Sequence, residues 1–73
     1  MSKRLEGVVV SFNGDRGFGF IKPDDGGGDF FVRWTEIVMD GFKALAVGAR
    51  VRFEPYIEPE TGNRQALEVH LVP

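Results

Sequence analysis

The sequence predicts an all-β domain whose five short strands close into one small barrel. Short runs rich in Val, Ile and Phe alternate with clusters of Gly, Asn, Asp and Pro, and the sequence contains no long amphipathic helical pattern. The 73 residues are enough for one core and too few for two well-covered sheets. Closing a single sheet into a barrel removes exposed strand edges and buries one interior. We therefore expect one domain over residues 1–73, with its core roughly between residues 5 and 71.

The first two strands are predicted to form a hairpin. The run from Leu5 to Phe12 is rich in Val, and it is followed by Asn13-Gly14-Asp15, a strong turn signal. The second strand runs from Arg16 to Lys22. Because successive side chains of a strand point to opposite faces, Phe18 and Phe20 project from the same side. Gly17 and Gly19 fall on the other face and leave it free to approach a neighbouring strand closely.

The third strand lies between two irregular segments. The stretch from Pro23 to Gly28 contains a proline, adjacent acids and three glycines, so it is predicted to be a loop. The strand itself extends from Asp29 to Trp34. After it, Thr35 is a candidate cap for a single helical turn through Glu36 to Met39.

The last two strands complete the expected barrel. The fourth runs from Ala49 to Glu54, a loop covers Pro55 to Asn63, and the fifth runs from Arg64 to Leu71. The expected interior consists of the apolar residues on the inner faces of the strands: Val9, Ile21, Phe30, Val32, Val51, Phe53, Leu67 and Val69.

Three phenylalanines are not needed for that interior. If the second and third strands are neighbours, Phe18, Phe20 and Phe31 share one outer face with Arg33. Clustered exposed aromatic rings cost solubility and usually mark a binding surface. Nucleobases stack on aromatic rings and on Arg guanidinium planes, so this face is a candidate platform for nucleic acid.

The charge balance limits how nucleic acid is bound. Nine Lys and Arg residues stand against eleven Asp and Glu residues, for a net charge of -2. A protein that gripped nucleic acid by bulk charge alone would be more basic. We therefore expect binding to depend on a local basic patch and on stacking.

Other function classes lack a sequence signal. The chain has no Cys, and His70 is its single histidine, so neither a disulfide nor a transition-metal site is expected. No nucleophile–base pair is indicated by spacing, and we expect no catalysis, no cofactor and no small-molecule substrate. No apolar run approaches the roughly 20 residues of a membrane span, so we expect no membrane partner and a cytoplasmic location.

Two segments of the chain resemble a known family. Gly17-Phe18-Gly19-Phe20-Ile21, followed by Phe30-Phe31-Val32, is similar to the paired RNA-binding motifs of the cold-shock domain of bacterial cold-shock proteins, and the similarity extends from about Leu5 to Val69. The resemblance implies an antiparallel five-stranded OB-type barrel with Greek-key topology. It also implies binding of single-stranded RNA and DNA with low sequence specificity. Members of the family act as RNA chaperones and as regulators of transcription and translation under cold or growth stress.

The resemblance also implies which residues bind. The implied stacking residues are Phe12, Phe18, Phe20, Phe31, Arg33, Trp34 and Phe42. The implied polar and phosphate contacts are Asn13, Arg16, Lys43 and Arg64. Packing alone is the alternative for Phe12, Trp34 and Phe42, and a solvated charge is the alternative for each basic residue.

The first strand departs from the family pattern. Ser11 stands where the family commonly has an exposed Trp, and Val8 and Val10 stand where it often has Lys. These changes leave open a second function, in which the aromatic face of an OB-like module binds a protein partner. Nothing in the sequence indicates an oligomer, and RNA and DNA are not distinguished as ligands.

Overall fold

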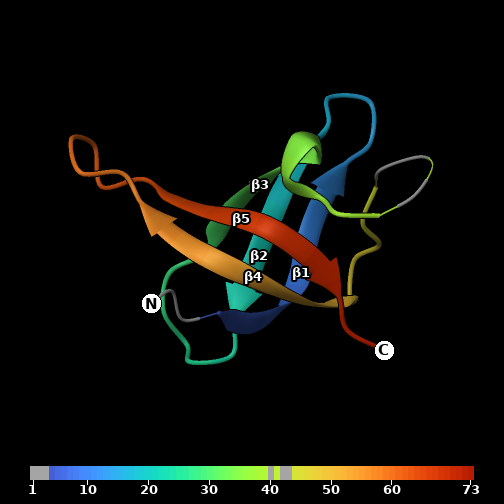
Figure 1. The fold of residues 1–73 in the computed structure, drawn as a ribbon, viewed down its shortest axis with the longest axis horizontal. Coiled ribbons are helices and arrows are strands. Elements are labelled where there is room, and N and C mark those ends of the chain that lie inside the picture. The colour runs from blue at the N-terminus through green and yellow to red at the C-terminus, as the bar shows by residue number, and fades with distance from the viewer. Residues whose placement is uncertain (1–3, 40, 42–43) are drawn as a thin grey trace.

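The computed structural model describes residues 4–39, 41 and 44–73 (Figure 1). Its elements in chain order are β1 (Leu5–Asn13), β2 (Phe18–Pro23), β3 (Phe30–Arg33), one turn of 3-10 helix η1 (Trp34–Glu36), β4 (Arg50–Ile57) and β5 (Arg64–Leu71). In Figure 1, β4 and β5 form a long hairpin that crosses in front of β1, β2 and β3, and its connecting loop extends beyond the rest of the molecule.

The five strands close into a barrel, as predicted, and their order around it is β1-β2-β3-β5-β4. Closure depends on β1, which pairs with β2 and, through Leu5 to Val8, also with β4. The prediction of an antiparallel sheet throughout is wrong at one contact, because β3 and β5 are parallel and pair at Phe31 and Gln65. Along the sequence, β4 lies between these two strands, and it returns the chain so that β5 runs in the same direction as β3.

Two predicted strand boundaries differ from the structure by two or more residues, and the others by at most one residue. β2 begins at Phe18, two residues later than expected, because residues 14–17 form a turn in which the Gly17 N–H donates to the Asn13 carbonyl (2.7 Å). β4 continues to Ile57, although the segment after Glu54 was predicted as loop. Its last residues still pair with β5, from Pro55 opposite Ala66 to Ile57 opposite Arg64.

A helical turn follows β3, but it lies earlier than the predicted turn through Glu36 to Met39, and Thr35 does not cap it. The turn spans Trp34–Glu36, so Thr35 lies in its middle, and Arg33 occupies the cap position without a side-chain capping hydrogen bond. The Trp34 N–H donates to the Gly17 carbonyl (2.8 Å), which fixes the start of the turn beside the β1–β2 hairpin.

Seven of the eight predicted interior residues are buried, and Leu67 is the exception. The β4–β5 pairing shifts register between Arg52 and Glu54, and Glu68 on the facing stretch of β5 adopts a positive φ of 47°. This bulge breaks the strict alternation, so Ala66 and Val69, three residues apart, both face inward while Leu67 is only half-buried.

The connection between β3 and β4 supplies core residues that the sequence did not indicate. Ile37 and Leu45 are buried in the same hydrophobic cluster as the strand residues. Ile37 also forms a parallel bridge with Val69 of β5. With these two residues the interior closes without any of the three phenylalanines assigned to the outer face.

Candidate nucleic-acid interface

The register of β1, β2 and β3 places the predicted aromatic residues on one outer face. Directly opposite residues in a sheet share a face, so each cross-strand row can be read from the pairing. The two central rows are Asn13–Phe18–Arg33 and Ser11–Phe20–Phe31. This face of the barrel therefore carries three rings and one guanidinium on two adjacent strands.

We call Phe18, Phe20 and Phe31 the ring triad. The centroid of the Phe31 ring lies 5.6 Å from that of Phe18, with the planes 29° apart, and 5.7 Å from that of Phe20, in an edge-on arrangement. Phe20 is 39% exposed, and the other two rings are half-buried against one another and their surroundings. The triad is a continuous apolar surface held in place by its own ring contacts.

A glycine between the rings allows β1 to lie close against β2. Gly19 is buried opposite Phe12, and a Cβ added there would meet the Phe12 Cα at 2.7 Å and the Ser11 carbonyl oxygen. Any larger residue would push the two strands apart at the level of Phe20. Gly19 therefore allows the close spacing of β1 and β2 behind the outer face that carries the rings.

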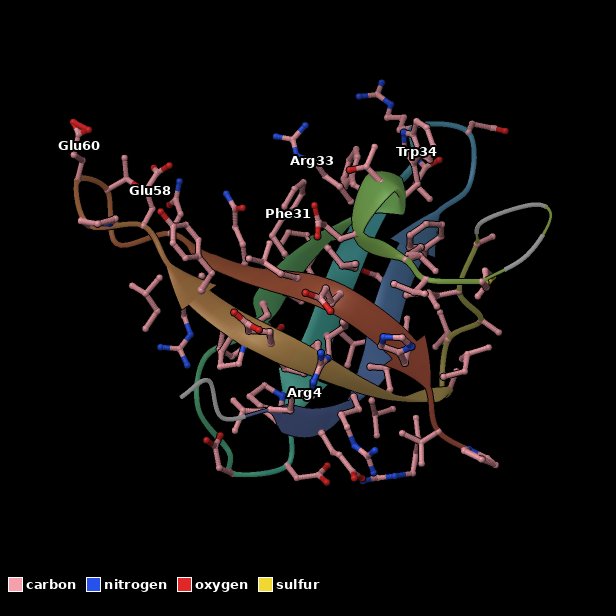
Figure 2. All side chains as sticks on the ribbon, in the orientation of Figure 1. Arg4, Phe31, Arg33, Trp34, Glu58 and Glu60 are labelled. Carbon is pink, nitrogen blue, oxygen red and sulfur yellow. The ribbon has the colours of Figure 1, made fainter. Side chains whose placement is uncertain are left out.

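Trp34 extends the aromatic surface at one end. Its indole ring occupies the space that a Cβ on Gly17 would need, and Gly17 has a positive φ of 76°. Trp34 is nevertheless 50% exposed. Figure 2 shows Phe31, Arg33 and Trp34 on the same side of the barrel, beside η1.

Arg33 places a permanent positive charge beside the rings. Its guanidinium carbon lies 5.4 Å from the centroid of the Phe31 ring. A guanidinium plane at this position offers both a stacking surface and a donor for phosphate oxygens.

A groove of about 450 Å³ continues from the ring triad toward the β4–β5 loop. Its lining consists of Phe20, Asp29, Phe31, Arg33, Gly62, Asn63, Arg64 and Gln65. The Arg64 guanidinium carbon lies 4.5 Å from the centroid of the core residue Phe30, and its Nε is buried without a hydrogen-bond partner among the described residues. The predicted phosphate contact Arg64 therefore lies on the same surface as the rings.

At the other end of the sheet, two arginines are engaged in ion pairs. Glu6 bridges Arg50 (3.1 Å) and Arg52 (2.9 Å), and Arg50 also reaches Asp24 (2.6 Å). Hydrogen bonds donated by Arg52 and then by Arg50 lower the pKa of Glu6, and the hydrogen bonds that Arg50 donates to Asp24 and Glu6 raise the pKa of Arg50. We call Glu6, Asp24, Arg50 and Arg52 the ion-pair lattice.

The cations near the rings differ from those of the lattice. Within residues 4–39, 41 and 44–73, no ion pair involves Arg16, Arg33 or Arg64. The lattice holds two acids and two arginines and so carries no net charge, whereas the cations beside the aromatic face have no ion-pair partner among the described residues.

Two predicted site residues near the first turn also have local structural roles. Phe12 lies opposite the inward-facing Gly19 and is half-buried against the core, so it does not share the face of the ring triad. The Asn13 Oδ1 accepts the backbone N–H groups of Asp15 (3.0 Å) and Arg16 (3.1 Å), which closes the hairpin turn. Phe42 and Lys43, also predicted for the site, lie outside the described residues.

The structure adds residues to this surface that the sequence analysis did not select. Lys22 is exposed on β2 opposite Val8, two residues beyond Phe20 and on the same face. The alternation of side chains along β2 was enough to place Lys22 on the same face as Phe20. Asn63 and Gln65 line the groove because β5 pairs with β3, and no local sequence pattern predicts that contact.

Within the part of the chain that the structure describes, no three His, Cys, Asp or Glu side chains gather into a potential metal site. Among the same residues, none belongs to a helix with the length and apolar character needed to cross a membrane.

The fold and sequence match known proteins over nearly the whole chain. The family described as the 'Cold-shock' DNA-binding domain matches residues 5–72. A cold shock protein of Arthrobacter globiformis is 55% identical over 49 residues, covering 67% of this chain and 73% of that protein. The cold shock-like protein CspE of Escherichia coli K12 is 54% identical over 54 residues, covering 74% and 77% of the two chains.

A solved structure shares the architecture at low sequence identity. Drosophila Unr CSD456 superposes with a TM-score of 0.80 and 22% identity. The match covers 99% of this chain and 28% of the Unr chain, so it supports the barrel fold alone.

Proposed function

Because the chain belongs to the cold-shock domain family, a nucleic-acid-binding family, we propose that it binds single-stranded RNA and DNA with low sequence specificity. The observation that carries this proposal is the ring triad, three phenylalanines grouped on the outer face of β2 and β3 and excluded from the core. In this function residues 1–73 act as one domain, with its core roughly between residues 5 and 71, and the place of action is the cytoplasm.

The rings act on unpaired bases. Each base stacked on an aromatic side chain contributes about 1–3 kcal/mol, whatever its identity, because every base has a π-face. Bases inside a duplex are already stacked and cannot reach the triad. Binding therefore favours the single-stranded form and opens weak hairpins by mass action, without ATP. This is the chemistry of an RNA chaperone that regulates transcription and translation under cold or growth stress.

The cations beside the rings position the backbone. Arg33 stacks on Phe31, Arg64 lines the adjoining groove, and Arg16 is exposed in the turn next to Phe18. Because these contacts are few, the logarithm of affinity should fall with the logarithm of salt concentration with a slope of about two to four charges. A slope near zero would contradict the role of these residues.

A second candidate function is recognition of a protein partner by the same face. It is favoured by β1, where Val8, Val10 and Ser11 contribute no ring and no charge beside Phe20. In this alternative, nucleic acid is a secondary ligand or is not bound.

Titration of the Trp34 fluorescence distinguishes the two functions. Trp34 is the only tryptophan, is half-exposed and lies at the end of the aromatic face. Oligo-dT and oligo-U should quench or shift its emission at micromolar protein and low salt, and a duplex of equal length should do so far less. A flat titration with both single strands would reject the proposed function and favour the protein-binding alternative.

A further inference from the structure

The turn between β1 and β2 contains an Asn–Gly pair whose chemistry the proposed function does not use. Asn13 ends β1, Gly14 follows it, and both residues are exposed. Because glycine has no Cβ, its backbone nitrogen is not shielded by a side chain of its own and can attack the carbonyl of the preceding Asn side chain. The space around Gly14 is open, since a Cβ built there would have no atom within 4 Å. The pair is therefore accessible to water and free to react.

Two backbone N–H groups point at the oxygen on which charge develops in such an attack. The Asn13 Oδ1 accepts hydrogen bonds from the N–H groups of Asp15 (3.0 Å) and Arg16 (3.1 Å). Attack on the Asn13 Cγ converts this oxygen into an oxyanion. Donors about 2.7–3.1 Å from a developing oxyanion stabilise the transition state of acyl transfer. The turn thus brings together a nucleophile, an electrophile and an oxyanion site.

The reaction that this arrangement permits is deamidation through a cyclic imide. Hydroxide removes the Gly14 amide proton, the Gly14 nitrogen bonds to the Asn13 Cγ, and the bond from Cγ to the side-chain nitrogen breaks. That nitrogen takes a proton from water and leaves as ammonia. Water then opens the imide at either of its two carbonyl carbons, which gives aspartate or isoaspartate at position 13. Water and hydroxide are the only co-reactants, and nothing is oxidised or reduced.

The product alters the surface that carries the rings. Asn13, Phe18 and Arg33 form one cross-strand row, so a carboxylate at position 13 lies two strand spacings, or about 10 Å, from the backbone of Arg33. It adds one negative charge to a net charge of -2. The new charge therefore competes with phosphate for the cation beside the rings.

An isoaspartate at position 13 also changes the backbone of the turn, because the main chain then passes through the former side chain. The Gly17 N–H donates to the Asn13 carbonyl (2.7 Å), and the Trp34 N–H donates to the Gly17 carbonyl (2.8 Å). This chain of hydrogen bonds connects the reactive turn to the start of η1. A longer backbone at position 13 thus disturbs the support of the Trp34 indole.

We propose that Asn13 is a self-modification site, at which the β1–β2 turn of the folded protein deamidates its own Asn side chain and so weakens binding of single strands. The modification itself needs no ligand, and its effect on binding rests on the proposed function. The affinity of the ring face consequently declines with the age of each molecule, without the action of an enzyme.

The test of the modification is incubation of the folded protein at physiological temperature and mildly alkaline pH, followed by mass spectrometry of its peptides. The peptide that contains Asn13 should gain the mass difference between an amide and a carboxylic acid. Asn63, the other Asn of the chain, is the matched control, because Arg64 follows it and shields its own backbone nitrogen. Asp25-Gly26 has no ammonia to release and so does not contribute to the mass gain.

A variant assigns the mass gain to the turn. Gly14→Ala should slow the gain severalfold, because the new methyl group shields the attacking nitrogen. It should keep the fold, since that methyl group meets no atom within 4 Å. Absence of a mass gain at Asn13 in the folded protein would overturn the proposal, and a gain in the urea-unfolded chain alone would show that the turn protects this residue.

The test of the effect on binding is titration with oligo-dT at low salt. Asn13→Asp, which carries the charge of the product, should bind about two- to fivefold more weakly than the unmodified protein, and the difference should shrink as salt is added. Incubated protein should lose affinity in step with the mass gain, and incubated Gly14→Ala should lose it severalfold more slowly.

Two outcomes separate the modification from the proposed function. A mass gain at Asn13 without a change in oligo-dT affinity would overturn the effect on binding. Failure of freshly prepared, unmodified protein to bind oligo-dT would reject the proposed function instead, and the mass gain would still establish the modification site.

Discussion

Phe30 and Phe31 are neighbours in β3 and have opposite surroundings. Phe30 is 1% exposed and packs against the buried Phe53, with 5.0 Å between ring centroids. Phe31 points to the other face, where it contacts the rings of Phe18 and Phe20 and the Arg33 guanidinium. The same side chain therefore stabilises the barrel at one position and forms a surface at the next.

The difference shows that residue type does not define the site. Two phenylalanine clusters of similar ring spacing occupy the two faces of one sheet, and only the register of the strands separates them. The inner cluster is complete without the outer one. Mutations in the two clusters should consequently separate stability from binding.

The largest expected effect comes from the inner cluster. Phe30→Ala should lower the free energy of unfolding by about 3–5 kcal/mol, because it removes a fully buried ring and leaves a cavity. Phe20→Ala is the matched control, since it loses one ring contact worth about 0.5–1.5 kcal/mol and a side chain that is already 39% exposed. Urea unfolding of both variants measures the contrast. Equal losses would mean that the outer rings belong to the core.

Mutations in the outer cluster should instead weaken oligonucleotide binding. Phe31→Ala should weaken binding of oligo-dT by about 1–3 kcal/mol, or roughly five- to 150-fold, because the central ring of the triad is lost. Val47→Ala, which truncates an exposed loop residue, should leave the affinity unchanged. Fluorescence titration under conditions where each variant is folded tests this, and an unchanged affinity of Phe31→Ala would remove the triad from the site.

The assignment of the phenylalanines to an inner and an outer face could largely be predicted from the sequence. Alternation in β2 and β3 was enough to assign Phe18, Phe20 and Phe31 to one face and Ile21 and Phe30 to the other, because a strand has a period of two. Closure of the barrel followed from the number of short strands and the need to remove edges.

The errors come from long-range contacts. The bulge at Glu68 moved Ala66 inward and Leu67 outward, and its cause is the pairing with β4. The burial of Ile37 likewise depends on its bridge to Val69 in β5. No window of neighbouring residues contains these contacts, so a local pattern could not have supplied them.

An effect of intermediate size is expected when Gly17, on which the Trp34 indole packs, is replaced. Gly17→Ala should cost about 1–2 kcal/mol for the left-handed backbone alone, and it should displace the indole that fills the space of the new methyl group. Gly14→Ala is the control in the same turn, because a Cβ there has no atom within 4 Å. We expect altered Trp34 emission and weaker oligonucleotide binding in Gly17→Ala only. Identical behaviour of the two variants would show that Trp34 does not depend on Gly17.

The smallest expected effect comes from a mutation in the ion-pair lattice, and it is a change in stability that depends on pH. The pKa of Glu6 is lowered in the folded protein by hydrogen bonds from Arg52 and Arg50. The lattice therefore stabilises the protein above the ordinary pKa of Glu6, and this contribution is lost as the pH falls through the lowered value. Glu6→Gln should have a slightly lower melting temperature near neutral pH, and the difference from the unmodified protein should shrink as the pH falls below the ordinary pKa of Glu6.

Two further measurements, one on a control variant and one on Glu6→Gln, complete the test of the lattice. Glu60→Gln, in the β4–β5 loop and without an ion pair among the described residues, should show no pH-dependent difference in melting temperature. Oligo-dT affinity of Glu6→Gln should equal that of the unmodified protein, since the lattice holds its arginines away from the rings. A melting difference that grows toward acid would contradict the lowered pKa. A marked change in affinity would show that Arg50 and Arg52, once released from Glu6, take part in binding.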